Sequence, residues 1–275
     1  PCTKIIISKK INRVIFSIND TDPRSRNHAS KELNKNQIKI KEFVLKDFAK
    51  IFYKSYFTQS TKEIPFIDAK IAVSKDFFTV NKKNKWITNK KSRVLANFLR
   101  SKYDCLLTTS KTINDDNPIL NCRIEGLEKK SPDLVILDRL FKIKLNSVIF
   151  KKNKGNIYIL TNINNLSKER FFKKIGVKVI KLENKSSPIN SLKNIFIEIK
   201  KMGFNRILVE SGITFLNQLI KYDFIKNFYL FKSSLNLKSR GFNYSNPLYL
   251  KQLNISEKNE IKVNLTGDTL YKVKL

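Results

Sequence analysis

The 275-residue sequence has one histidine, one tryptophan, one methionine and three cysteines. A single histidine leaves little scope for acid–base catalysis of the kind that histidine usually performs. Cys2, Cys105 and Cys122 are odd in number and lack CxxC spacing, which argues against a disulfide framework and for a reducing, cytoplasmic environment. No apolar run reaches the roughly 18 residues that span a membrane, and the first apolar stretch is too short for a signal peptide.

Acidic residues are also scarce, because 23 Asp and Glu stand against 55 Lys and Arg, for a formal net charge of +32. Only ten basic residues are arginine, which sites that bind nucleic acid favour for its bidentate fork. The lysine excess accompanies many Ile, Asn and Phe residues, which indicates a composition bias rather than a nucleic-acid footprint. A basic nucleic-acid-binding module is the alternative from another class. In either case the charge should attract phosphorylated small molecules.

The 41% hydrophobic content excludes a disordered chain, and the length suits one or two domains. A polar segment at 59–63 precedes Ile64-Pro65, so we expect a boundary between domains at 1–63 and 64–275. In the first domain, we expect helices at 3–10, 29–34 and 46–58, and strands at 13–18 and 37–45. The sequence begins with Pro1 rather than Met, so we expect a mature fragment, a trimmed chain or an incomplete reading frame.

From residue 66 onward, short β-rich runs alternate with helical segments. Such alternation predicts an α/β fold, a mostly parallel sheet with helices on its faces. The expected strands are 66–74, 105–109, 134–138, 157–161, 177–181 and 206–210. The expected helices are 88–102, with Thr88 as N-cap, then 167–174, 191–202 and 212–221. The strand-rich end, at 227–231, 261–265 and 270–275, fits antiparallel strands that close the sheet.

Polar groups gather at the ends of predicted strands, where ligands bind in open α/β sheets. One segment is Lys85-Trp86-Ile87-Thr88, with Arg100 at the end of the following helix. A second begins at Thr109-Ser110 and continues through Asp115-Asp116-Asn117-Pro118 to Arg123. A third is Val209-Glu210-Ser211-Gly212, at a change from strand to helix.

Together with Lys70-Ile71-Ala72-Val73-Ser74, these segments resemble, in order and spacing, the reductase domain of the riboflavin-biosynthesis deaminase/reductase (RibD) family. The resemblance covers residues 65–275 and implies the fold of dihydrofolate reductase. It implies NADPH as cofactor, bound by Ala72, Trp86, Thr112, Asp116, Gly212, Ile213 and Thr214. It implies substrate contacts from Asn84, Arg100, Leu120, Arg123 and Glu210, with Lys70 as a candidate catalytic residue.

The resemblance extends upstream into a partial, cytidine-deaminase-like α/β segment. Pro1-Cys2 resembles the last zinc-binding Pro-Cys of the family's deaminase domain, and Asp22-Pro23 fits its C-terminal half. Such a zinc site needs three ligands and a catalytic Glu. Only Cys2 is present here, and the sole histidine, His28, is not followed by Ala-Glu. We therefore expect no catalytic zinc in this chain, and zinc only if a complete deaminase domain lies upstream.

Each candidate residue also has a plainer interpretation. Trp86 could be a core aromatic, and Thr112 and Asp116 could cap a helix. Arg100 and Arg123 could form surface salt bridges rather than bind the substrate phosphate. Glu210 could act as an N-cap for the next helix.

Several positions depart from the family pattern. They are Phe77-Phe78 in place of Gly-Arg, Asn84 in place of Ser, Arg139 in place of Ser, Ile213 in place of a small residue or Pro, and Asn236 in place of Gly. These departures affect the substrate side of the expected pocket more than the cofactor side.

The resemblance implies an NADPH-dependent reductase acting on 5-amino-6-(5-phosphoribosylamino)uracil, whose ribosyl group becomes ribityl, most simply by hydride delivery to C1′ of the ring-opened imine. The cofactor carries the hydride in such a reaction, and the pocket supplies position and electrostatics. The alternative within the same fold is a reductase of another pyrimidine or pteridine. The expected partner is the phosphorylated aminopyrimidine, with a homo-oligomer formed through the reductase domain and no membrane.

Overall fold

The computed structural model describes all residues except 1, 21–27, 54–55, 57–62 and 254. The chain divides into two compact units, Pro1–Glu63 and Ile64–Leu275. Pro1, the 22–23 turn and part of the expected 46–58 helix lie outside the described residues. No helix in the described ranges is long and apolar enough to cross a membrane.

Unit 1 is a small α/β segment. Its described elements are α1 (Cys2–Ser8), β1 (Arg13–Ile15), α2 (His28–Lys35), β2 (Lys39–Lys41) and α3 (Lys46–Phe52). β1 and β2 pair in parallel, with Arg13 opposite Lys39. Both strands are shorter than expected. β2 ends early because Phe43 and Leu45 adopt positive φ angles of 65° and 56°, a left-handed conformation that does not continue a strand.

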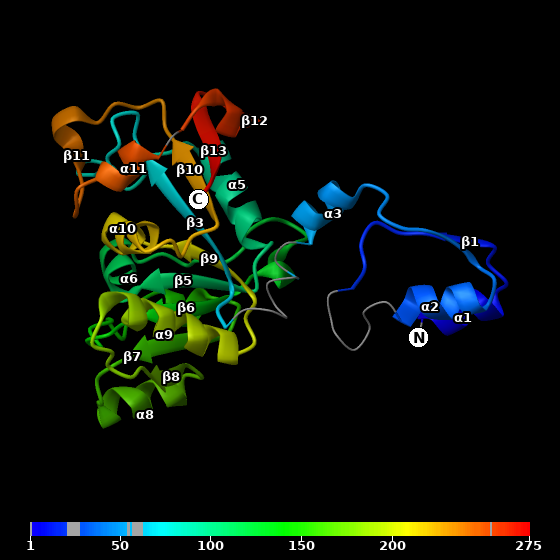
Figure 1. Ribbon diagram of the computed structural model, residues 1–275. Helices are drawn as coiled ribbons and strands as arrows, with labels where there is room; N and C mark the ends of the chain where they lie inside the picture. The colour runs from blue at the N-terminus through cyan, green and yellow to red at the C-terminus, as the bar shows by residue number, and fades with distance from the viewer. Residues whose placement is uncertain (1, 21–27, 54–55, 57–62, 254) are drawn as a thin grey trace. The chain divides into compact units, whose positions relative to one another are not determined.

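Unit 2 is built on a nine-stranded sheet with the order β12-β13-β10-β3-β9-β5-β6-β7-β8 (Figure 1). The seven strands from β10 to β8 in this order run parallel to their neighbours, whereas β13 and β12 are antiparallel. This confirms the mostly parallel sheet with antiparallel C-terminal strands. The parallel strands are β3 (Phe66–Val73), β5 (Cys105–Thr109), β6 (Asp133–Leu137), β7 (Ile157–Thr161), β8 (Lys178–Lys181), β9 (Arg206–Glu210) and β10 (Asn227–Lys232). The antiparallel strands are β12 (Glu260–Leu265) and β13 (Asp268–Lys274).

Helices cover both faces of this sheet, and each face has its own apolar core (Figure 1). One core receives side chains from α9 (Pro188–Lys201), α10 (Ile213–Lys221) and α11 (Leu248–Gln252). The other receives side chains from α5 (Lys90–Arg100), α6 (Ser110–Asp116), α7 (Ile149–Lys152) and α8 (Leu166–Lys174). Central strands that are buried on both faces consist of continuous apolar runs. These runs are easy to recognise in the sequence, so the expected positions of the central strands agree well with the observed ones.

Two local features differ from expectation. The N-cap of α5 is Asn89 rather than Thr88, because the Asn89 side chain accepts a hydrogen bond from the backbone N–H of Ser92 at 3.0 Å. A two-stranded ribbon also joins β4 (Val80–Asn81) to β11 (Gly241–Phe242). Residues of β4 line the pocket described below.

Candidate active site

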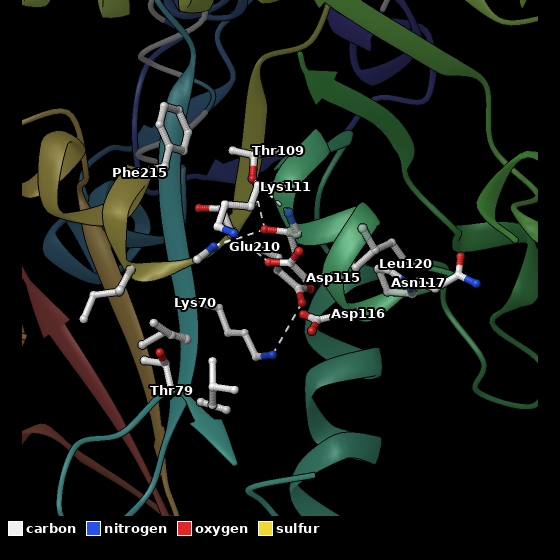
Figure 2. A pocket seen from close by; sticks show the side chains of 18 of the residues that line it. Lys70, Thr79, Thr109, Lys111, Asp115, Asp116, Asn117, Leu120, Glu210 and Phe215 are labelled. Carbon is white, nitrogen blue, oxygen red and sulfur yellow. Dashed lines mark hydrogen bonds and ion pairs between the residues drawn. The ribbon is translucent and has the colours of Figure 1, made fainter. Parts of the chain in front are cut away.

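A pocket of about 950 Å³ opens at the carboxyl ends of β3, β5 and β9 (Figure 2). It brings together every site residue that the resemblance implied for unit 2. These are Lys70, Ala72, Asn84, Trp86, Arg100, Thr112, Asp116, Leu120, Arg123, Glu210, Gly212, Ile213 and Thr214. Cys2 belongs to unit 1 and is exposed. Parallel strands present their carboxyl ends at one edge, so side chains far apart in the sequence meet there.

A buried ionic cluster forms the floor of the pocket. Arg100, at the end of α5, donates from Nε to Glu210 Oε1 at 2.7 Å and from Nη2 to Oε2 at 3.0 Å. Lys70 lies beside Glu210 in the β3–β9 register, and its Nζ donates to Glu210 Oε2 at 3.4 Å. Arg100 is 9% exposed and Glu210 is 7% exposed. Glu210 therefore occupies both donors of the Arg100 fork, in a buried ion pair. Arg100 was expected to bind the substrate phosphate or to form a surface salt bridge, and this buried pair corrects both expectations.

The electrostatics of this cluster favour an ionised Glu210. Burial opposes ionisation, but the charges of Arg100 and Lys70 outweigh it and lower the pKa of Glu210 from 4.5 to about 2. Glu210 is not an N-cap, because Gly212 occupies that position of α10. The remaining Arg100 donor, Nη1, bonds to Asn97 Oδ1 at 3.2 Å and to the Asn121 carbonyl at 3.0 Å.

Arg123 also lines the pocket, and its guanidinium makes fewer hydrogen bonds than that of Arg100. Among the described residues its only hydrogen bond is from Nε to Asn97 Oδ1, at 3.5 Å. Partial burial and the nearby charges of Arg100 and Arg93 lower the pKa of Arg123. Arg123 is therefore close enough to Arg100 and Arg93 to feel their charges, and of these three arginines only Arg100 pairs with a carboxylate, Glu210. This local excess of positive charge suits a phosphate.

The N-terminus of α10 opens into the same pocket. Gly212 is the N-cap and has no side chain to satisfy the first-turn N–H groups of residues 213–215. A helix N-terminus of this kind attracts anions. A Cβ at Gly212 would meet no atom within 4 Å, so the glycine leaves open space rather than relieving a clash. Beside it, the buried Ser211 hydroxyl has no hydrogen-bond partner in the described ranges. The free N–H groups at the start of α10 and the open space at Gly212 fit a nucleotide diphosphate.

Thr112 ties this helix end to α6. Its hydroxyl accepts a hydrogen bond from the backbone N–H of Gly212 at 3.2 Å and lies 3.0 Å from the Thr109 hydroxyl. The N-cap of α6 is Thr109, which accepts from the Thr112 N–H at 3.3 Å. Thr112 is therefore a bridge between two helix ends and not itself a cap.

Asp116 ends α6, and its carbonyl accepts a hydrogen bond from Lys85 Nζ at 2.9 Å. Burial and the neighbouring Asp115 raise the pKa of Asp116, with Lys85 and Lys111 acting in the opposite direction.

Trp86 stands at the pocket rim and is 48% exposed, which excludes the core-aromatic interpretation. Its ring lies under two cations, with Arg93 at 4.6 Å and Lys85 Nζ at 5.6 Å from the centroid. A half-exposed indole held in this way offers a flat apolar surface to a ligand ring.

Lys111 and Tyr244 are among the pocket residues that were not found from the sequence. Lys111 pairs with Asp115 at 2.9 Å, and its Nζ lies 3.8 Å from the centroid of the Tyr244 ring. Lys111 adjoins Thr112 in a recognised motif, so its position was a usable signal. Tyr244 arrives through the β4–β11 ribbon, and no motif or spacing pointed to it.

Residues 65–236 match the RibD C-terminal domain family. The chain belongs to this family. It is 29% identical over 233 residues to the riboflavin biosynthesis protein RibD of Aquifex aeolicus, covering 84% of this chain and 64% of that protein. It is 30% identical over 148 residues to a 5-amino-6-(5-phosphoribosylamino)uracil reductase of Buchnera aphidicola subsp. Acyrthosiphon pisum, covering 49% of this chain and 67% of that protein.

The RibD-family assignment extends to the fold. A Thermotoga maritima diaminohydroxyphosphoribosylaminopyrimidine deaminase/5-amino-6-(5-phosphoribosylamino)uracil reductase matches with a TM-score of 0.78 and 23% identity. That match covers 100% of this chain and 74% of the other. The chain thus spans about two thirds of the length of the Aquifex relative and three quarters of the Thermotoga protein.

Proposed function

We propose that the chain catalyses the NADPH-dependent reduction of 5-amino-6-(5-phosphoribosylamino)uracil to the ribitylamino product of riboflavin biosynthesis. The observation that carries the proposal is one pocket that unites an anion-attracting helix N-terminus, a buried carboxylate and two arginines, Arg100 and Arg123. Membership of the RibD C-terminal domain family and the reductase activity for which the Buchnera relative is named support it.

On the cofactor side, NADPH would supply the hydride. The N–H groups at the start of α10 bind the diphosphate, and Gly212 leaves room for it. Trp86 offers its exposed ring face to the nicotinamide. Thr112 holds the ends of α6 and α10 together, and Asp116 lies at the other end of α6. Ala72, Ile213 and Thr214 complete the wall.

On the substrate side, Arg123 binds the phosphate, since its guanidinium has only one long hydrogen bond among the described residues. Glu210 accepts hydrogen bonds from the pyrimidine or the ribosyl hydroxyls, and Arg100 holds its carboxylate in place. The hydrogen bond from Lys70 to Glu210 is long, at 3.4 Å, so the Lys70 ammonium can also donate to a substrate oxygen. Asn84 and Leu120 line the same space.

Unit 1 we assign to the C-terminal part of a deaminase-like domain. The Thermotoga structure, which carries a deaminase in its name, matches over 100% of this chain and so includes unit 1. Cys2 is exposed, and the described residues contain no group of three or more His, Cys, Asp or Glu arranged to hold a metal. We propose that unit 1 has no deaminase activity and that the chain self-associates through unit 2.

Steady-state kinetics test the function. Purified chain should oxidise NADPH when 5-amino-6-(5-phosphoribosylamino)uracil is added. Arg123→Gln should lower kcat/KM about 10- to 100-fold, chiefly through KM, because a charge-assisted hydrogen bond is worth roughly 1.5–3 kcal/mol.

The matched control is Arg170→Gln. Arg170 is exposed on α8 and lines no part of the pocket, so this variant makes the same charge change without the expected loss. No NADPH oxidation by the wild-type chain would overturn the proposed activity. Equal kinetics for the two variants would overturn the role of Arg123.

A further inference from the structure

A short strap of chain, residues 241–246, links two walls of the pocket. At one end, the Asn243 side chain accepts hydrogen bonds from the backbone N–H and the hydroxyl of Thr79, both at 2.8 Å. At the other end, the Asn217 side chain of α10 donates to the carbonyl of Asn246 at 2.8 Å. The strap is therefore fastened to the loop after β3 on one side and to α10 on the other.

Close packing and hydrogen bonds fix the backbone of the strap. Phe78, which stands where the family has arginine, lies against Gly241, and a Cβ on this glycine would come within 2.1 Å of the Phe78 ring. Just before the strap, Asp76 accepts the backbone N–H groups of Leu237 at 3.1 Å and Lys238 at 2.8 Å. The fixed backbone sets where the side chains of the strap begin, and these side chains move by rotation about their own bonds.

Tyr244 in the strap touches Lys111 across the edge of the sheet. The Lys111 Nζ lies 3.8 Å from the centroid of the Tyr244 ring, and both residues line the pocket. Lys111 belongs to α6, which packs on one face of the sheet, whereas α10, to which the strap is fastened, packs on the other. The contact therefore spans the carboxyl edge where the pocket opens. Both side chains are about half exposed, so the contact lies on the solvent side of the pocket.

This contact is weak enough to open. A cation–π contact at an exposed site changes a population by about two- to fivefold. Lys111 also pairs with Asp115 at 2.9 Å, but that carboxylate is on α6 itself and stays with the lysine when the ring turns away. The Tyr244 hydroxyl makes no hydrogen bond with the described residues, so the rotation breaks none.

We propose that Tyr244 and Lys111 form a gate, which a dinucleotide parts as it enters and leaves and which closes again over the bound molecule. The inference rests on the proposed function, which assigns the diphosphate to the N-terminus of α10. The gate stands beside that helix end, because Thr112, the neighbour of Lys111, accepts a hydrogen bond from the Gly212 N–H at 3.2 Å.

A gate has a kinetic signature that a ligand contact lacks. Exposed side chains rotate within picoseconds to nanoseconds, so both exchange rates scale with the fraction of time that the gate is open. A gate that is closed in the free and the bound chain slows association and dissociation by the same factor and leaves Kd unchanged. A contact to the bound dinucleotide acts mainly on the dissociation rate instead.

Stopped-flow measurement of NADPH fluorescence gives both rates, and calorimetry gives Kd. Tyr244→Leu should raise association and dissociation about two- to fivefold each and leave Kd nearly unchanged. Tyr244→Phe keeps the ring and should restore the wild-type rates. In a Lys111→Gln chain, which has no ammonium to hold the ring, Tyr244→Leu should change neither rate further. Tyr222→Leu is the matched control, because Tyr222 meets the Lys221 ammonium at 5.4 Å but does not line the pocket.

The outcomes separate the gate from the proposed function. A wild-type chain that does not bind NADPH overturns both. If the wild-type chain binds and oxidises NADPH, unchanged rates in Tyr244→Leu overturn the gate alone. Faster dissociation without faster association also overturns it, since Tyr244 then contacts the cofactor directly. An undiminished effect of Tyr244→Leu in the Lys111→Gln chain does the same, because the ring then acts without the lysine.

Discussion

Replacement of Glu210 by glutamine tests the ionic cluster at the pocket floor. The variant keeps the shape of the side chain but removes the negative charge between Arg100 and Lys70. Arg100 is 9% exposed, so little water can compensate for the lost partner. Breaking a buried pair by removing one member costs roughly 3–5 kcal/mol, because the other charge is left buried and unpaired.

The pKa of Glu210 provides a second magnitude. It lies at about 2 in the folded chain against an ordinary 4.5. At 1.36 kcal/mol for each pKa unit, this difference corresponds to about 3 kcal/mol of stability. Because the folded pKa is depressed, this contribution is complete above about pH 4.5. It is lost as the pH falls toward about 2.

Urea unfolding at two pH values measures both effects. At pH 7 we expect Glu210→Gln to lower the free energy of unfolding by about 3 kcal/mol. At about pH 3 the gap from wild type should shrink to about half or less, since the wild-type carboxylate has lost much of its advantage there. Glu198→Gln is the control, because Glu198 is partly exposed and pairs with the exposed Lys201, and such surface pairs contribute about 0–1 kcal/mol. Equal losses in the two variants, or a gap that does not depend on pH, would refute the reasoning.

Two further predictions concern aromatic residues. NADPH should quench the fluorescence of the single tryptophan, because Trp86 lines the pocket. A fluorescence titration of the wild-type chain beside Trp86→Phe checks this. If calorimetry shows that NADPH binds but the fluorescence is not quenched, the nicotinamide does not lie at Trp86. Tyr103→Phe should lower the free energy of unfolding by about 1.5–3 kcal/mol, because it removes the 2.6 Å hydrogen bond to the buried Asp68 carboxylate. Urea unfolding of Tyr103→Phe beside the control Tyr229→Phe tests this prediction, since the Tyr229 hydroxyl has no hydrogen-bond partner in the described part of the chain. Equal losses of unfolding free energy in the two variants would contradict it.

Local sequence was sufficient to locate the buried strands of the sheet, and the family resemblance named part of the pocket lining. The strands at 105–109 and 206–210 appear as β5 and β9 with the same bounds, because strands buried on both faces need uninterrupted apolar residues. Polar residues that directly follow such strands must lie at the carboxyl edge, so their convergence could be expected before any contact was known. The roles assigned to them remain proposals.

Short elements were harder to locate. The 37–45 run has the composition of a strand, but positive φ angles at Phe43 and Leu45 reduce it to Lys39–Lys41. Thr88 and Asn89 are both good caps by residue type. Only the hydrogen bond from the Ser92 N–H to the Asn89 side chain decides between them.

Partner choice came from tertiary structure alone. Arg100 and Glu210 are 110 positions apart, and no spacing rule links them, yet Glu210 occupies the fork that the motif suggested for a phosphate. Arg139 shows the opposite case, in which folding buries part of an arginine and the described residues provide it with no anionic partner. Sequence sets which residues stand at the end of each strand, through local apolar patterns. Which charges are neutralised there depends on strand order and helix packing, which bring distant segments within hydrogen-bonding distance.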